Sequence, residues 1–256
     1  MLVATWNINS IRARLDRLLA WLAAAKPDVV CLQETKTVES KFPTAELAAA
    51  GYASESFGQP TYNGVAILAR RPITHVQRGL CEHLADDQAR FLAADVMGVR
   101  ILNAYFPNGQ EVGSKQFEYK LQWMLALRQY LDARHTPGEP VLLCGDFNVA
   151  MDDADVARPM QWAASVLCCP PVRAALDHIR DWGFVDIFRQ HNPEGHLYSW
   201  WDYRARAFER NEGLRLDHLL ASPPLARRCL AARVEIDQRR GEKPSDHAPV
   251  VCELRE

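Results

Sequence analysis

Polar side chains follow several apolar, strand-like runs of this 256-residue sequence, at positions where they could bind a cation or a phosphate. Asn7 and Asn9 follow the first run, and Glu34 follows the second. Asp146 and Asn148 stand at the end of a third run. Because ligands gather at the carboxyl ends of strands in α/β sheets, we expect these side chains to converge on one site. Their hard oxygen atoms suit Mg²⁺ or Mn²⁺ better than zinc, and so few protein ligands would leave coordination positions open for a phosphate oxygen.

Two residues of the last third of the chain could supply charge and proton transfer. Asp217 precedes Leu219 and Leu220, so it is a carboxylate within an apolar strand pattern, and such a group needs a partner. His247 follows Asp246 just before the final strand pattern. Each residue also has an ordinary structural interpretation, because an aspartate can be a surface charge, an asparagine a turn residue and a histidine a core residue. The occurrence of all of them in this order favours a catalytic site.

The elements that must position these residues alternate between strand and helix patterns in the first part of the chain. Apolar runs predict strands over residues 3–8, 29–33, 64–69, 93–96, 99–105 and 140–144, and later near 196–200, 214–221, 234–237 and 249–254. Helical spacing predicts helices over 14–25 and 114–135, the second with Ser114 as its N-cap, and another around Val172, Leu176 and Ile179. Because no linker, repeat or low-complexity stretch interrupts the pattern, we predict a single domain over residues 1–256, with many strands and few helices in layers.

The composition limits the class of protein. The formal net charge is -2, unlike that of a protein that coats DNA without specificity, but an enzyme that grips a few phosphates needs only a local basic patch. No apolar run approaches the roughly 20 residues that span a bilayer, and the N-terminus lacks a signal-peptide pattern, so we expect no membrane anchor. The odd number of cysteines and the lack of a Cys-x-x-Cys pair predict reduced thiols in a cytoplasmic protein rather than disulfides or a zinc site. The seven are Cys31, Cys81, Cys144, Cys168, Cys169, Cys229 and Cys252.

Together, the motifs around these residues resemble the exonuclease III family, whose members are apurinic/apyrimidinic endonucleases with 3′-exonuclease activity. The motifs are WNIN (6–9), LQETK (32–36), YNGVA (62–66), NAYFP (103–107), GDFN (145–148), GLRLD (213–217) and KPSDHAP (243–249). The resemblance is collinear from residue 3 to about residue 254. It implies a four-layer α/β sandwich, in which two mainly antiparallel sheets pack face to face with helices outside and the site lies at one end.

The resemblance implies a metal site built from three of the polar residues. Glu34 would be the principal ligand of a catalytic Mg²⁺, for which Mn²⁺ could substitute, and Asn9 and Asp246 would lie nearby. Asn7 would hold the polar groups of the site in place. The sequence leaves open whether one metal ion or two take part.

The resemblance also assigns the catalytic roles. Asp146 would orient or deprotonate the attacking water, and Asn148 would position it. His247 would contact the scissile phosphate, and Asp217 would orient the imidazole and stabilise its charge. Tyr105 would contact the phosphate from the other side. Whether Asp146 or a metal-bound hydroxide is the base stays open.

The expected partner is double-stranded DNA, especially abasic sites and 3′ ends, bound by a monomer. Segment 198–210 interleaves aromatic residues with arginines, which suits stacking on bases and contact with phosphates. The apolar segment 163–169 would border the pocket for a flipped abasic sugar. Basic residues that could line the DNA path include Lys115, Lys120, Arg239 and Arg240. The expected substrate-binding residues are Asn108, Trp200, Leu214, Leu216, Tyr62 and Arg204.

Two other functions are compatible with parts of the sequence. A phosphodiesterase that acts on lipid headgroups or small phosphates would share the catalytic core, but no apolar membrane-facing loop is evident, and segment 198–210 favours DNA. A DNA-binding relative without catalysis is disfavoured because every catalytic position is filled.

Overall fold

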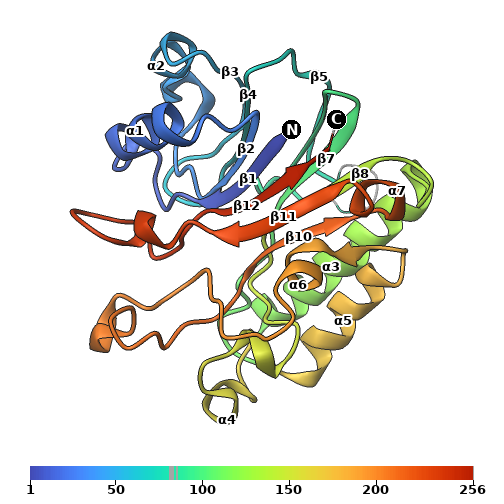
Figure 1. Cartoon of the computed structure of the whole chain (residues 1–256). Coiled ribbons are helices and arrows are strands. Elements are labelled where there is room, and N and C mark those ends of the chain that lie inside the picture. The colour runs from blue at the N-terminus through green and yellow to red at the C-terminus, as the bar shows by residue number, and fades with distance from the viewer. Residues whose placement is uncertain (81–83, 85, 256) are drawn as a thin grey trace.

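Two sheets pack face to face in the computed structural model, which describes residues 1–80, 84 and 86–255 (Figure 1). Within these residues, the first sheet has the strand order β11 (Cys229–Val234), β12 (Val250–Leu254), β1 (Leu2–Asn7), β2 (Val29–Gln33), β4 (Val65–Ala69) and β3 (Ala53–Phe57). The second has the order β5 (Thr74–Arg78), β6 (Phe91–Val96), β7 (Val99–Tyr105), β8 (Val141–Asp146), β10 (Asp217–Ala221) and β9 (Val185–Asp186). The pairs β1–β2 and β7–β8 are parallel, and the other named pairs are antiparallel.

Helices cover the outer faces of both sheets (Figure 1). Helices α1 (Leu15–Ala25) and α2 (Thr44–Ala49) share an apolar cluster with the first sheet, and α3 (Lys115–Arg134) and α5 (Pro170–Arg180) share one with the second. A further cluster lies between the sheets. This arrangement confirms the predicted four-layer sandwich. The shorter elements are η1 (Glu39–Lys41), η3 (Asp153–Asp155), α4 (Pro159–Trp162), α6 (Ile187–His191), η4 (Arg204–Arg206), α7 (Pro223–Ala226) and η5 (Ile236–Arg239).

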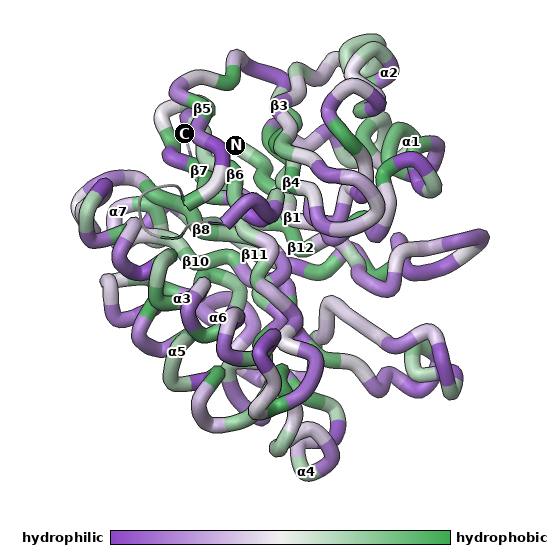
Figure 2. The backbone as a smooth tube through the Cα atoms, turned by 180° about the vertical axis from the view of Figure 1, so that it is seen from behind, coloured by the Kyte–Doolittle hydropathy of each residue, from purple (hydrophilic) through white to green (hydrophobic). Residues whose placement is uncertain are grey.

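The central strands are apolar on both faces because both faces are covered. In β2, Val29 and Cys31 face the second sheet, whereas Val30 and Leu32 face the helices, as the twofold alternation of a strand requires. Figure 2 shows the consequence, since the strands are hydrophobic along most of their length and the loops that project beyond the sheets are largely hydrophilic.

Buried amides also join the two sheets. Gln33 Nε2 donates to Thr5 Oγ1 at 2.9 Å and to Asn103 Oδ1 at 2.7 Å. Asn103 Nδ2, from the second sheet, donates to the carbonyl oxygens of Leu32 at 3.0 Å and Ala66 at 2.8 Å in the first. A slip of one sheet over the other would leave these buried groups unpaired, at about 1–3 kcal/mol for each group. The hydrogen bonds therefore fix how the ends of β2 and β7 lie relative to each other.

Most predicted elements are confirmed to within two residues, including the Ser114 cap, whose side chain accepts from the Phe117 N–H at 3.1 Å. Two predicted strands are wrong. Residues 196–200 form a loop in which only Trp200 makes isolated bridges, to Leu214 and His247, and residues 236–239 form η5. Strands β3 and β5 were not predicted because they are half-exposed edge strands with polar sequences.

Six of the cysteines lie within the described residues. Cys31, Cys144, Cys168, Cys169, Cys229 and Cys252 are buried and free, and Cys81 lies outside the described residues. Within the described part of the chain, no helix combines the length and apolar character needed to cross a bilayer.

Candidate active site

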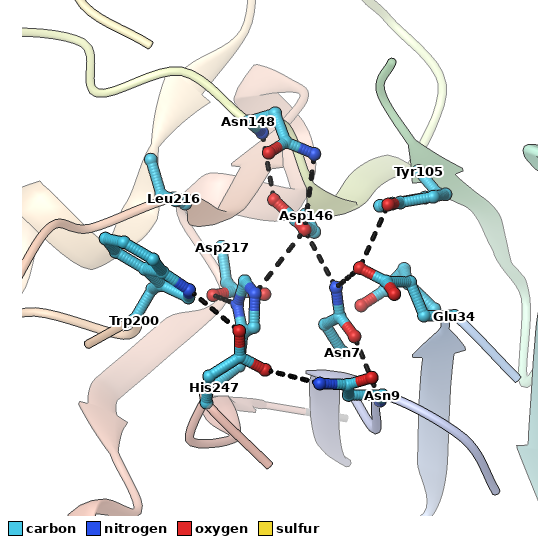
Figure 3. Close-up of polar contacts among 12 residues, drawn as sticks. Asn7, Asn9, Glu34, Tyr105, Asp146, Asn148, Trp200, Leu216, Asp217 and His247 are labelled. Carbon is cyan, nitrogen blue, oxygen red and sulfur yellow. Dashed lines mark hydrogen bonds and ion pairs between the residues drawn. The ribbon is translucent and has the colours of Figure 1, made fainter. Parts of the chain in front are cut away.

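The carboxyl ends of the two parallel strand pairs meet at the same end of the sandwich. Strand β1 lies against β8, and β2 lies against β7. Asn7 ends β1, Glu34 follows β2, Tyr105 ends β7 and Asp146 ends β8. Asp217 begins β10 directly opposite Asp146, because β10 runs antiparallel to β8. The expected convergence of strand ends is therefore present, and Figure 3 shows the side chains pointing toward one another.

Three of the predicted site residues have left-handed backbone conformations just after a strand. Asn9, Glu34 and Asn148 have φ angles of 45°, 51° and 50°, in the left-handed region that residues other than glycine rarely adopt. Hydrogen bonds hold the turn at Glu34, since its carbonyl oxygen accepts from the Ser10 N–H at 2.7 Å. Backbone strain of this kind concentrates at functional sites.

The amide of Asn7 connects carboxylates from both sheets. Its Nδ2 donates to Glu34 Oε1 at 2.8 Å and to Asp146 Oδ2 at 2.9 Å, and the Asn7 side chain is fully buried. The Tyr105 hydroxyl donates to the same Glu34 oxygen at 2.9 Å. Tyr105, expected to contact a phosphate, thus supports Glu34 in this structure.

His247 lies between two carboxylates. Its Nδ1 is 2.7 Å from Asp217 Oδ2, and its Nε2 is 3.7 Å from Asp146 Oδ2. Burial lowers the pKa of His247, but Asp217 and Asp146 outweigh burial and raise that pKa to about 10. His247 is therefore an imidazolium at neutral pH, with the N–H at Nδ1 donating to Asp217 and the N–H at Nε2 facing the site.

The environments of Glu34 and Asp146 move their pKa values in opposite directions. Burial raises the pKa of Asp146 to about 7, with help from Asp217 and against His247 and Asn7. Burial also opposes ionisation of Glu34, but the Lys36 ammonium and the Asn7 amide outweigh it and lower the pKa of Glu34. Glu34 thus keeps its charge for a cation, whereas Asp146 can take a proton near neutral pH.

The residues expected to bind metal already converge on a cation. Lys36 Nζ lies 2.7 Å from Glu34 Oε2 and donates to Asn9 Oδ1 at 2.6 Å. Asn9 Nδ2 in turn donates to Asp246 Oδ1 at 2.9 Å. A carboxylate and an amide oxygen that share one ammonium group form a donor set that fits Mg²⁺. Asp146, Asp217 and His247 could also hold a metal, since their ligand atoms lie within 4.8 Å of one another, but His247 would first have to lose its proton.

Most of the predicted site residues belong to one network of hydrogen bonds and ion pairs. Trp200 joins it through Nε1, which donates to Asp246 Oδ2 at 3.0 Å, and Asn108 joins it through Nδ2, which donates to Asn148 Oδ1 at 3.1 Å. The members are Asn7, Asn9, Glu34, Tyr105, Asn108, Asp146, Asn148, Trp200, Asp217, Asp246 and His247.

The remaining predicted substrate residues lie outside this network. Leu214 and Leu216 are buried at 0% and 2% exposure, in the apolar cluster under α3 and α5. Tyr62 is 68% exposed on the loop before β4. Arg204 is on an exposed loop, where its Nε lies 3.2 Å from Asp202 Oδ1.

A cavity of about 410 Å³ opens beside the network. Trp200, Val166 and Leu167 line it as expected, whereas Leu214, Leu216 and Cys168 are not among its lining residues. Sequence reasoning missed Trp162, which also lines it and meets Trp200 edge to face, with ring centroids 5.9 Å apart.

Two serines and a lysine that support the site were also missed. Ser199 Oγ accepts from the Asp217 N–H at 3.0 Å, and Ser245 Oγ donates to the Asn7 carbonyl oxygen at 2.7 Å. Lys36 pairs with Glu34, and its position two residues after that acid could have indicated the ion pair. The serines offered none, because a buried hydroxyl has no pattern of its own.

Known proteins resemble this chain over its full length. The sequence profile of the endonuclease/exonuclease/phosphatase family matches residues 4–247. Exodeoxyribonuclease III of Haemophilus influenzae is 35% identical over 98% of both chains, and DNA repair nuclease APEX1 of Danio rerio is 29% identical over 99% of this chain and 82% of its own. Among solved structures, an AP endonuclease from Archaeoglobus fulgidus has a TM-score of 0.97, with 38% identity over 99% of both chains. A 3′-5′ exonuclease (NExo) from Neisseria meningitidis has a TM-score of 0.96, with 41% identity over 100% of both chains.

Asp217 and His247 should act as a unit, because the carboxylate orients the imidazolium and stabilises its charge. Asp217→Asn and His247→Asn should each lower kcat for phosphodiester hydrolysis by about 10³–10⁴-fold, and the double variant should lose little more than the worse single. Asp237→Asn, at an exposed position, is the matched control. Fully additive losses in folded variants would show that the two residues act separately.

The raised pKa values of Asp146 and His247 predict a bell-shaped dependence of kcat/KM on pH. A base at Asp146 would act as the carboxylate, so activity should fall as pH drops through about 7. A phosphate-binding cation at His247 would act as the imidazolium, so activity should fall again as pH rises through about 10. His247→Asn should abolish the alkaline fall in its residual activity. A profile that is flat between about pH 5 and pH 8 at fixed metal concentration would contradict the assignment of Asp146.

Proposed function

This chain belongs to the endonuclease/exonuclease/phosphatase family, and from that premise we propose that it is a DNA repair nuclease of the exodeoxyribonuclease III type. It hydrolyses DNA phosphodiester bonds, both as a 3′-to-5′ exonuclease and as an apurinic/apyrimidinic endonuclease. Residues 1–256 act as one catalytic domain, because both sheets supply residues to the site. The enzyme works as a monomer on double-stranded DNA. The free thiols support a reducing, cytoplasmic location.

The proposal is carried by the imidazolium of His247 and the carboxylate of Asp146, which face each other across 3.7 Å beside the cation-binding oxygens. Glu34, Asn9 and Asp246 would hold Mg²⁺, with Mn²⁺ as a substitute. When bound, the ion supplies positive charge to the phosphate oxygen that becomes more negative in the transition state. The site therefore has a base and two sources of positive charge at one end of the sandwich.

The residues of the chain divide the remaining work. His247 donates its Nε2 proton in a hydrogen bond to a non-bridging phosphate oxygen, while Asp217 keeps the ring oriented and charged. Asp146 accepts the proton of the attacking water, which its raised pKa near neutrality favours. Asn148 positions that water, and Asn108 donates to the phosphate from the exposed side.

The loops around the site favour DNA over a lipid headgroup. The loops before β10 and between β11 and β12 project at the site end of the sandwich (Figure 1). Arg239 joins them, because its guanidinium lies 4.9 Å from the ring centroid of Tyr203 and 5.3 Å from that of Phe208. Arginines and aromatics on projecting loops suit the phosphates and the minor groove of a duplex.

A panel of substrates tests the function directly. The purified chain would be assayed with Mg²⁺ or EDTA on an abasic duplex, a recessed 3′ end, a 3′-phosphate end, an RNA–DNA hybrid and a lipid phosphodiester. We expect metal-dependent cleavage of the DNA substrates. Cleavage of the lipid alone, or binding of DNA without cleavage, would contradict the proposal.

Glu34→Gln should lower the rate of DNA cleavage in Mg²⁺ by at least about 100-fold while the protein still folds, because the amide cannot replace the charge of the carboxylate. The same variant should bind Mg²⁺ more weakly in calorimetry, a readout that does not depend on activity. Glu39→Gln, on an exposed turn five residues further along the chain, is the matched control. Near wild-type cleavage at ordinary Mg²⁺ by Glu34→Gln would remove Glu34 from the metal site.

Trp200 should matter more for abasic incision than for exonuclease action, since it lines the 410 Å³ cavity expected to hold the flipped sugar. Trp200→Ala should lower the ratio of abasic incision to exonuclease rate by about tenfold, at one salt concentration. Trp200→Phe is the control, because it keeps a ring in the cavity and loses only the hydrogen bond to Asp246. If the wild type degrades 3′ ends but never incises abasic duplex, the cavity does not accept the sugar and the endonuclease part of the proposal is wrong.

A further inference from the structure

A buried lysine lies beneath the site, where the proposed mechanism does not use it. Lys120 is on α3, and its side chain is 0% exposed. Its Nζ donates to the carbonyl oxygens of Asn148 at 2.7 Å, Val166 at 2.7 Å and Asn108 at 3.1 Å. Only the protonated amine has three N–H groups, so the ammonium form alone satisfies all three acceptors. From the sequence, Lys120 could have lined a DNA path on the surface, but its burial excludes that role.

The three carbonyl groups belong to three loops that meet at the site. Asn108 follows β7, Asn148 follows β8, and Val166 lines the cavity. The amides of Asn108 and Asn148 bond to each other, and the Asn148 N–H donates to Asp146 Oδ1 at 2.9 Å. Asn148 has a φ of 50°, an uncommon conformation for a residue other than glycine, and Lys120 donates to its carbonyl oxygen.

On the basis of the proposed function, we propose that Lys120 is a positioning residue for phosphodiester hydrolysis. Its ammonium group fixes the backbone at Asn108 and Asn148, and thereby aligns their side-chain amides with Asp146 and the attacking water. Lys120 touches neither the substrate nor the water and acts through these two asparagines.

Electrostatics and packing support this role. Burial lowers the pKa of Lys120 to about 7, whereas Asp146 opposes that shift. The three carbonyl acceptors favour the ammonium form. The lysine stem packs under Gly109, where an added Cβ would lie 3.1 Å from Lys120 Cδ. A bulkier side chain would not fit this space, and an apolar chain of similar length is therefore the suitable replacement.

Lys120→Met tests the inference, because methionine fills the space and donates no hydrogen bond. We expect kcat on a recessed 3′ end to fall by about 10–100-fold, with KM changed less than about threefold, since substrate contacts are retained. Arg134→Met is the matched control, because it removes a positive charge from an exposed position of the same helix, about 21 Å along its axis. Combined with Asn148→Ala, Lys120→Met should cost little beyond the worse single variant.

The outcomes separate this inference from the proposed function. An inactive wild type would refute the nuclease itself. An active wild type whose Lys120→Met variant has normal kcat, or whose loss adds fully to that of Asn148→Ala, would overturn the role of Lys120 alone. Should Lys120→Met fail to fold, ¹⁵N NMR of the wild type decides, because the Lys120 ammonium signal should be protected from exchange and shift when duplex DNA and Mg²⁺ bind. An unprotected signal that does not shift would overturn the role.

Discussion

The two hydrogen bonds of the Asn7 amide hold carboxylates from opposite sheets in one site. Asn7 is neutral and has two donors, so Glu34 and Asp146 can approach each other without sharing a proton. Beneath it, the hydrogen bonds among Gln33, Thr5 and Asn103 fix how the two sheets lie against each other. The geometry of the site thus depends on buried amides that take no part in the chemistry. Apolar packing alone, which lacks direction, would not fix the distance between the two acids.

Residues at equivalent places in the fold acquire different chemistry from their neighbours. Glu34 and Asp146 both stand where a central strand ends, and both are largely buried. Lys36 keeps Glu34 ionised, whereas burial raises the pKa of Asp146 against the opposing charge of His247. The pKa of His247 is raised because Asp217 and Asp146 outweigh the effect of burial, which alone would lower it. One end of the sandwich therefore holds three ionisable groups in one hydrogen-bond network: Glu34 as an anion, Asp146 as a base that can be protonated near neutral pH, and His247 as a cation.

The resemblance to the exonuclease III family allowed the four-layer fold to be predicted. The centre of the candidate site could also be predicted from the residues, because an apolar run followed by a polar residue marks a strand end. The sequence could not indicate contacts between distant loops, such as the bond from Trp200 to Asp246. Leu214 and Leu216 were expected at the substrate pocket, but the alternation of an irregular segment does not reveal which face is covered. Lys120 carried an unused signal, since it occupies the same helical face as Phe117 and Met124, where a lysine must have buried partners.

The position of β12 between β11 and β1 has a consequence for synthesis of the protein. The first sheet joins residues 2–7 to residues 250–254, so it cannot close until β12 has been synthesised. His247 immediately precedes that strand, and its backbone carbonyl accepts from Trp6 Nε1 at 3.1 Å. A nascent chain therefore holds Asn7 and Glu34 long before it can place the imidazolium beside them. The candidate site is therefore completed only when β12 joins β1, which makes it one of the last parts of the fold to form.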